Sequence, residues 1–225
     1  MALFKINGER NSGTLFLEYL LEANGLRTYV HEADDSGVHY HWKHGVPTSD
    51  YKTLGKRVVD IFIFRKLEDW LVSTWKTPYH LVPIKGFGDF LVNKQESSEQ
   101  EFTDYHTGRC LNADDIGKTI FEIRYYKFHK IMEYAQTNKD VLFVNLAFLQ
   151  DADNACTFLS MLYSRFMGIK NPKNLVTEIA EHTKTGVLRE KNRKYEVNME
   201  YYRDIIDSHK DVEIERFIDG ISVLG

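Results

Sequence analysis

The chain reads Gly8-Glu9-Arg10-Asn11-Ser12-Gly13-Thr14 near its N-terminus, and this stretch decides the expected fold. An apolar segment over residues 2–6 precedes it, and a run rich in helix-forming residues over 14–23 follows it. Strand, glycine loop and helix in this order favour a phosphate-binding loop, because amides at a helix N-terminus attract an anion. The alternative is a glycine-bearing turn that binds nothing.

The stretch departs from the loop of nucleotide kinases at two positions. That loop reads Gly, four residues, Gly, Lys and then Ser or Thr. Here Thr14 stands in place of the lysine and Leu15 in place of the magnesium-binding hydroxyl, while Arg10 is the one cation of the loop. In ATP- and GTP-hydrolysing enzymes the lysine and the magnesium ion neutralise a doubly charged γ-phosphoryl group. This loop therefore suits a less highly charged group, or one bound without a metal.

The rest of the chain alternates predicted strands with predicted helices. Apolar patterning indicates strands over 38–42, 57–64 and 141–145, and helices over 67–75, 116–136, 152–167 and 195–208. The alternation predicts an α/β fold in three layers, with a parallel sheet covered by helices on both faces, of the P-loop-containing nucleotide-binding type. We expect a single domain over 1–225, with 81–114 as a substrate-facing insertion, because connections of that length are rarely structureless.

Composition limits the classes of partner. The 225 residues are 43% hydrophobic and 28% charged, as in soluble globular proteins. The net charge of −4 provides no field that attracts nucleic acid, so an anionic ligand requires a local cluster of cations. No signal peptide or membrane-spanning run is visible, which predicts a cytoplasmic location. The two cysteines have neither zinc nor disulfide-framework spacing.

A second candidate cluster follows the expected strand over 57–64. Arg65 comes directly after that strand, and Ser73 lies eight residues later on the next helix. Ligands of open α/β sheets bind beyond the carboxyl ends of the strands. Arg65 is therefore placed for a forked contact with a phosphate, and Ser73 for a second hydrogen bond. A surface arginine and a helix serine without a ligand are the alternative.

Together these residues resemble the sulfotransferase family, whose donor is 3′-phosphoadenosine-5′-phosphosulfate (PAPS) and whose product nucleotide is 3′,5′-adenosine bisphosphate (PAP). The resemblance rests on the loop, on residues 65–80 (RKLEDWLVSTWKTPYH) and on the chain end. It departs from the family at Lys66-Leu67, where Asn-Pro is usual. It implies that the 3′-phosphate is held by Arg65 and Ser73. It implies that the 5′-phosphosulfate is held by Arg10, Asn11, Ser12, Gly13, Thr14 and Leu15.

Three histidines lie within residues 39–44. A metal site is one interpretation, but no cysteine or acidic ligand accompanies them, so we expect no metal. The family has a strand that ends in a catalytic histidine between its two donor motifs, and the resemblance therefore implies that His44 is the general base. Lys43 and Arg10 would stabilise charge on the transferring group. His41 is the alternative base, and a structural role is the alternative for His44.

Two further assignments follow from the resemblance. The basic run over 188–194 resembles a late loop that folds over the 3′-phosphate, which implies Arg189 and Arg193 as donor ligands; a solvated charged face is the alternative. Trp75, Tyr79 and His80 are candidates for the acceptor pocket, or core residues.

The resemblance implies a sulfotransferase that acts on a hydroxyl or amine, such as a glycan or a small alcohol. The rivals are a P-loop nucleotide or sugar kinase and a non-catalytic nucleotide-binding module. The sequence indicates no oligomeric state.

Overall fold

The computed structural model describes residues 2–28, 44–45, 47, 57–77, 84–93, 118–178 and 196–224. Its centre is a sheet of four strands in the order β1-β2-β3-β4. The first three strands run parallel, and the last pairs antiparallel with its neighbour. The strands are β1 (Leu3–Gly8), β2 (Val58–Phe64), β3 (Val141–Asn145) and β4 (Val223–Leu224).

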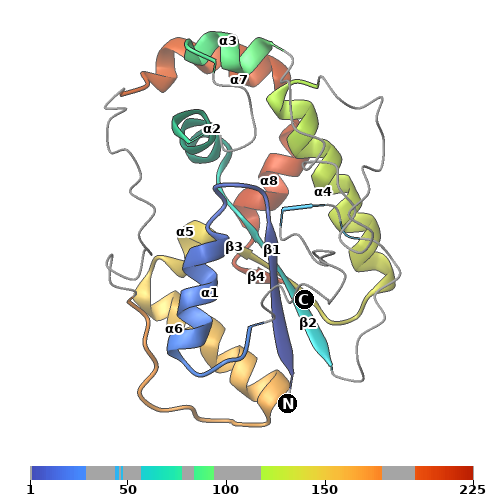
Figure 1. Ribbon diagram of the computed structural model, residues 1–225, viewed down its shortest axis with the longest axis vertical. Helices are drawn as coiled ribbons and strands as arrows, with labels where there is room; N and C mark the ends of the chain where they lie inside the picture. The colour runs from blue at the N-terminus through green and yellow to red at the C-terminus, as the bar shows by residue number, and fades with distance from the viewer. Residues whose placement is uncertain are drawn as a thin grey trace, which may run out of the picture.

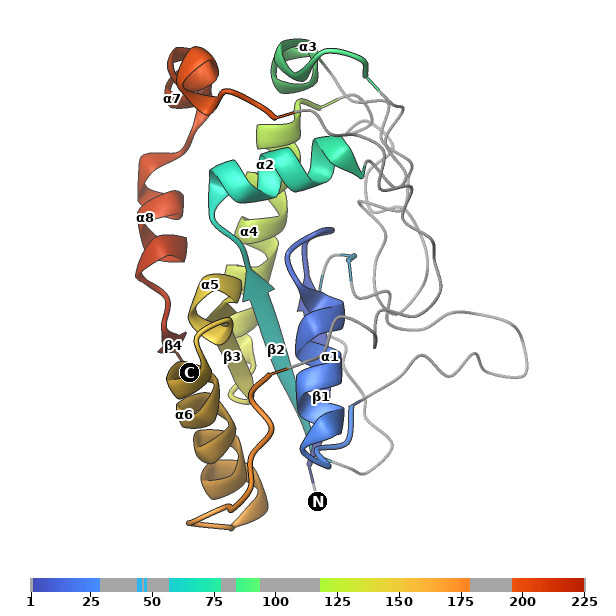
Figure 2. The same ribbon diagram turned by 90° about the vertical axis from the view of Figure 1, so that its left-hand side faces the viewer.

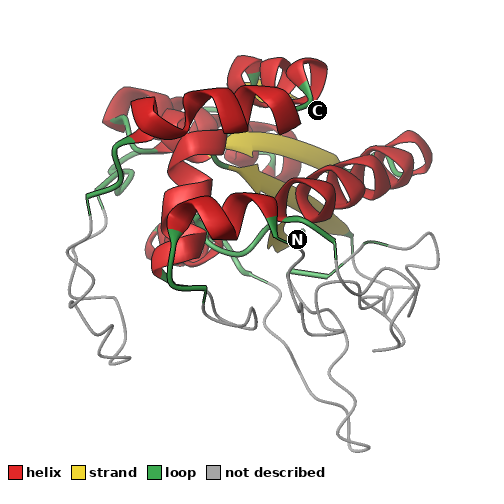
Figure 3. Cartoon of the chain, turned by 90° about the horizontal axis from the view of Figure 1, so that it is seen from above, coloured by secondary structure: helices red, strands yellow, loops and turns green. Residues whose placement is uncertain are grey.

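Helices cover both faces of the sheet, as the view from above shows (Figure 3). Side chains alternate along β2, so Ile61 and Ile63 belong to one apolar core and Phe62 and Phe64 to the other. The first core packs against α1 (Thr14–Ala23), α5 (Leu146–Leu149) and α6 (Ala152–Leu162). The second core packs against α4 (Ile120–Thr137) and α8 (Val212–Gly220).

A third apolar cluster lies above the carboxyl end of the sheet, at the top of Figure 1. It joins the first turn of α4 to three shorter helices, and Figure 2 shows α2 crossing above the strands. These helices are α2 (Leu67–Lys76), α3 (Phe87–Val92) and α7 (Arg203–His209). The register pairs Gly8 with Ile63 and Phe64 with Asn145, so the carboxyl ends of the three parallel strands meet beneath this cluster.

Local sequence accounts for the helix ends. Thr119 and Glu122 form a reciprocal capping box at the start of α4. Asp151 caps α6, and Asp211 caps α8. The first turn of α1 differs, since it has no side-chain cap and no acidic residue.

The predicted α/β class is confirmed, with three parallel strands between helices. β1, β2 and β3 occupy the predicted ranges within two residues at each end, and α1 and α2 match within one. The predicted strand over 38–42 and the basic run over 188–194 lie outside the described residues.

Four features differ from the prediction. The sheet is not wholly parallel, because the two-residue β4 joins it antiparallel and is too short to show strand periodicity. The helix expected over 152–167 ends at residue 162 and continues as a π-helical turn, η3 (Tyr163–Met167). The helix expected over 195–208 is a 3₁₀ turn, η5 (Met199–Tyr202), followed by α7. Finally, α3, α5 and α8 were not predicted, and α3 lies within the proposed 81–114 insertion.

Candidate functional site

The loop between β1 and α1 is held close to the sheet at both ends. A Cβ atom on Gly8 would lie 2.6 Å from the Ile63 carbonyl oxygen and 2.6 Å from the Ser12 Oγ, so only glycine fits there. Gly13 caps α1 with a φ of 104°, which is left-handed backbone that L side chains rarely adopt. The two glycines of the sequence motif therefore have structural reasons that do not depend on a ligand.

Inside the loop the side chains partly serve the loop itself. The Ser12 hydroxyl donates to the Glu9 carbonyl over 2.6 Å, and the Ser12 amide donates to the same oxygen over 3.2 Å. Asn11 has a φ of 62° and its Nδ2 donates to the Thr77 carbonyl over 3.3 Å. Thr14 is buried, whereas Leu15 is 48% exposed. The first amides of a helix lack intrahelical acceptors, and α1 offers no side chain in their place.

The segment after β2 holds the loop from the other side. Arg65 Nη1 donates to the Asn11 carbonyl over 3.2 Å, and Trp70 Nε1 donates to the Arg10 carbonyl over 2.8 Å. Arg65 is partly exposed, and so is Ser73 on α2. The structure thus brings the two predicted donor motifs together, although they are more than fifty residues apart in the chain.

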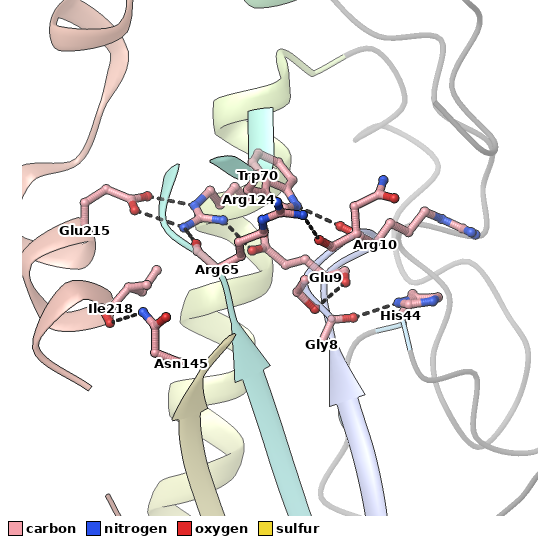
Figure 4. A network of polar contacts seen from close by, with 12 residues as sticks. Gly8, Glu9, Arg10, His44, Arg65, Trp70, Arg124, Asn145, Glu215 and Ile218 are labelled. Carbon is pink, nitrogen blue, oxygen red and sulfur yellow. Dashed lines mark hydrogen bonds and ion pairs between the residues drawn. The ribbon is translucent and has the colours of Figure 1, made fainter. Parts of the chain in front are cut away.

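His44 lies against the start of the loop (Figure 4). Its Nδ1 is 2.9 Å from the Gly8 carbonyl oxygen, and its own carbonyl accepts a hydrogen bond from Lys127 Nζ over 3.0 Å. Because a carbonyl oxygen can only accept, Nδ1 must carry a hydrogen in this contact. In the neutral ring Nε2 then carries the lone pair. In Figure 4 the side chains of Arg10 and His44 extend to the same side of the loop, and Arg10 is only 8% exposed.

Five of the predicted site residues and the alternative base cannot be placed against this geometry. They lie outside the described residues: His41, Lys43, Tyr79, His80, Arg189 and Arg193, together with the neighbouring His39.

Sequence reasoning missed a buried ionic cluster beside the loop, on the side away from His44 in Figure 4. Its centre is Arg124 of α4, which is 1% exposed. Its Nη1 pairs with Glu9 Oε2 at 2.5 Å, and its Nε and Nη2 pair with the two carboxylate oxygens of Glu215 at 2.7 and 2.9 Å. Nη2 also donates to the Arg65 carbonyl over 2.9 Å, and the guanidinium lies 4.8 Å from the centroid of the Trp70 ring.

The charge state of Arg124 is well defined. Burial by itself would lower the pKa of the Arg124 guanidinium, but the charge of Glu9 and the hydrogen bonds and charge of Glu215 outweigh burial and raise that pKa. Arg124 therefore stays charged at any physiological pH. One signal in the sequence could have found it: Arg124 and Lys127 stand among the apolar positions of the helix over 120–137, where a buried cation needs a partner.

The one described acceptor candidate, Trp75, lies on the buried face of α2 and is 7% exposed. Its Nε1 donates to the Ile84 carbonyl over 3.2 Å, and its ring packs edge-on against Phe87 with centroids 5.4 Å apart. Trp75 also forms part of the wall of a pocket of about 470 Å³. The other lining residues combine aromatic rings with charged and polar groups: Lys85, Phe87, Glu196, Val197, Asn198, Tyr201 and Tyr202.

Two absences concern the described part of the chain alone. Within it, no three His, Cys, Asp or Glu side chains are grouped so that they could hold a metal ion. Nor does any helix there have the length and apolar character needed to cross a membrane. Comparisons with protein-family models, with curated proteins and with solved structures found no match for this chain.

Proposed function

We propose that this protein is a PAPS-dependent sulfotransferase of the P-loop-containing type, which transfers a sulfuryl group to a hydroxyl or amine acceptor. One observation carries the proposal: the glycine loop, Arg65 and His44 converge at the carboxyl edge of β1 and β2. This edge is where open α/β sheets bind their ligands. The three motifs of the family resemblance, which are distant in sequence, thus occupy one site.

The donor would lie along the start of α1. The uncapped amides at this N-terminus, together with Arg10, suit the 5′-phosphosulfate. Arg65 is anchored to the loop by the Asn11 carbonyl and is partly exposed, which suits a fork on the 3′-phosphate, with Ser73 as the second donor.

The loop favours sulfuryl over phosphoryl transfer. No lysine follows Gly13, and Leu15 replaces the hydroxyl that holds magnesium in nucleotide kinases. A sulfuryl group bears less negative charge than a γ-phosphoryl group, so loop amides and one arginine are a better match for it. A P-loop nucleotide or sugar kinase would need a cation from elsewhere.

His44 is the preferred base. Its Nδ1–H is committed to the Gly8 carbonyl, which directs the lone pair to Nε2. In the reaction Nε2 takes the proton of the acceptor O–H or N–H, the acceptor atom bonds to sulfur, and the bond from sulfur to the bridging oxygen breaks. The electron pair of that bond stays on the departing 5′-phosphate of PAP, whose charge the loop amides and Arg10 stabilise. Lys43 would also stabilise this charge. Lys127 donates to the His44 carbonyl and would help to fix the position of the base.

The pocket beside Trp75 is the proposed acceptor site. It is linked to the loop through α2, because Thr77, two residues after Trp75, accepts the hydrogen bond from Asn11. Aromatic rings beside charged groups suit an amphipathic acceptor such as a sugar, with the rings against its apolar face.

Calorimetric titration with PAP and with 5′-AMP tests the donor site. The wild type should bind PAP more tightly than 5′-AMP. Arg65→Ala should weaken PAP binding by about tenfold or more, since a charged hydrogen bond is lost, and should hardly change 5′-AMP binding. Arg57→Ala, at the opposite end of β2, is the control and should leave both affinities unchanged. Absence of PAP binding by the wild type would overturn the function, and equal losses for both nucleotides would overturn the 3′-phosphate role.

His44→Ala tests turnover. With PAPS and a panel of hydroxyl and amine acceptors, this variant should release PAP at least about a hundredfold more slowly than the wild type, as expected for loss of a general base. Its affinity for PAP should change less than about threefold, because the base is not a donor ligand in this scheme. His129→Ala, at an exposed position of α4, is the control. Wild-type turnover in His44→Ala would contradict the assignment, and PAP binding by the wild type without turnover of any acceptor would favour the non-catalytic module.

A further inference from the structure

Arg124 contacts three described segments of the proposed donor site: the loop, the end of β2 and α2. It pairs with Glu9 of the loop, donates to the carbonyl of Arg65, and lies over Trp70, which itself donates to the carbonyl of Arg10. We propose that Arg124 is a positioning residue that holds the loop and Arg65 in the geometry that receives the donor. The inference rests on the donor site proposed above. Being 1% exposed, Arg124 would act through these neighbours and not on the ligand itself.

The contacts are directional and come from distant parts of the chain. Nη1 serves the loop, Nη2 serves the end of β2, and Nε with Nη2 grips Glu215 of α8. A guanidinium is planar and presents its N–H groups at fixed angles, so these three directions are set relative to one another. Moving any one of the three segments would break its hydrogen bond to Arg124. Lysine would carry the same charge without this geometry.

Stability alone is a weak reason for such a cluster. Removing charges from water is costly, and apolar side chains of similar volume often stabilise a core as well or better. The side chains paired in this cluster are one guanidinium and two carboxyl groups, and they lie beside a loop proposed to bind an anion. These three side chains offer an anionic ligand no surplus of positive charge, so the cluster must provide something other than attraction.

The position of Glu9 shows what the ionic cluster provides. This carboxylate belongs to the loop, yet it is only 3% exposed and is paired with Arg124 beside the loop. An unpaired Glu9 would face a large desolvation cost and would turn towards water, taking the loop backbone between Gly8 and Arg10 with it. Arg124 thus holds the negative charge of the loop away from the ligand and keeps the Arg10 and Arg65 backbone in place.

The experiment compares Arg124→Lys with Arg57→Lys. Arg57 is a matched control, because it forms the same kind of fork with Asp140 at the other end of β2 and is 52% exposed. Three quantities are measured for each full-length variant: the urea midpoint, hydrogen exchange of the amides over residues 8–14 without ligand, and the affinity for PAP. We expect Arg124→Lys to speed exchange in the loop and to weaken PAP binding about tenfold, as for a lost charge-assisted hydrogen bond. Arg57→Lys should change neither.

Two outcomes would overturn the inference. In the first, Arg124→Lys lowers the urea midpoint but keeps wild-type loop exchange and PAP affinity, which would make Arg124 a stabilising residue only. In the second, both arginine variants change loop exchange equally. If the wild type fails to bind PAP, the proposed function is wrong. Hydrogen exchange of the loop amides without ligand then still tests the role of Arg124.

A second pair of variants applies if Arg124→Lys does not fold. Glu9→Gln keeps an acceptor for Nη1 and should retain PAP affinity within about threefold, whereas Glu9→Ala removes the acceptor and should weaken binding about tenfold. This rescue by the conservative variant is expected of positioning through a hydrogen bond. Equal affinity in the two variants would contradict it.

Discussion

Two arginine forks lie at opposite ends of β2, and they differ in their surroundings. Arg57 grips Asp140 through Nε and Nη2 at 2.7 and 2.6 Å, with side chains 52% and 30% exposed. Arg124 grips Glu215 through the same two nitrogens at 2.7 and 2.9 Å, with side chains 1% and 9% exposed. The bond lengths are alike, so geometry within the fork does not separate the two. Burial and the additional contacts of Arg124 distinguish the two forks.

These surroundings explain where a buried ion pair is retained. An exposed fork gains little, because water and salt already screen its charges. A buried fork must recover the cost of desolvation through several contacts at once, and Arg124 has them to the loop, to Arg65 and to Trp70. The buried fork lies at the edge of the sheet proposed to bind the donor, and the exposed fork lies at the other edge.

The largest expected effect is on stability. Arg124→Met should lower the free energy of unfolding by about 3–5 kcal/mol, because it leaves Glu9 and Glu215 buried without their cation. Arg57→Met should cost less than about 1 kcal/mol, since its fork is open to water. Urea unfolding followed by circular dichroism measures both. Similar losses in the two variants would show that burial does not distinguish the forks.

A smaller effect distinguishes the hydrogen bond of Trp70 to the loop from that of Trp75 to Ile84. Trp70→Phe removes the hydrogen bond to the Arg10 carbonyl and should cost about 1–2 kcal/mol. Trp75→Phe, on the same helix, is the matched control, because its Nε1 bonds to Ile84 and not to the loop. Urea midpoints should fall in both variants, while PAP titration should weaken only in Trp70→Phe. An equal loss of PAP affinity in Trp75→Phe would contradict a special role of Trp70 at the loop.

The smallest effect is the pH dependence of the exposed fork. Hydrogen bonding to Arg57 holds the pKa of Asp140 below its ordinary value of 3.8 in the folded protein. A lowered carboxyl pKa contributes stability above the unfolded-state pKa, and this contribution is lost as the pH falls through the folded-state pKa. Wild-type stability should therefore fall below about pH 4 more steeply than that of Asp140→Asn, and the difference should shrink in high salt. Urea midpoints between pH 2 and 7 measure it, and parallel profiles would contradict it.

Much of the architecture was predictable, because it depends on local patterns. The apolar run before Gly8, the helix-forming run after Gly13 and the β-branched run over 58–64 each specify an element within a few residues of chain. The missed elements were short or weakly patterned, such as the four residues of α5 and the two of β4. Tertiary contacts stabilise such elements, and one sequence does not show those contacts.

The candidate site was also predictable only in part. The sequence by itself determined which residues follow β1 and β2, and hence that a glycine loop and Arg65 lie at one edge of a parallel sheet. The contact of His44 with Gly8 and the inward turn of Glu9 to an arginine 115 residues later depend on how the chain packs. Helix and strand periodicities report burial over a few residues, whereas a charge pair across 115 residues depends on how layers pack. The loop was therefore visible in the sequence, and the cluster that holds it was not.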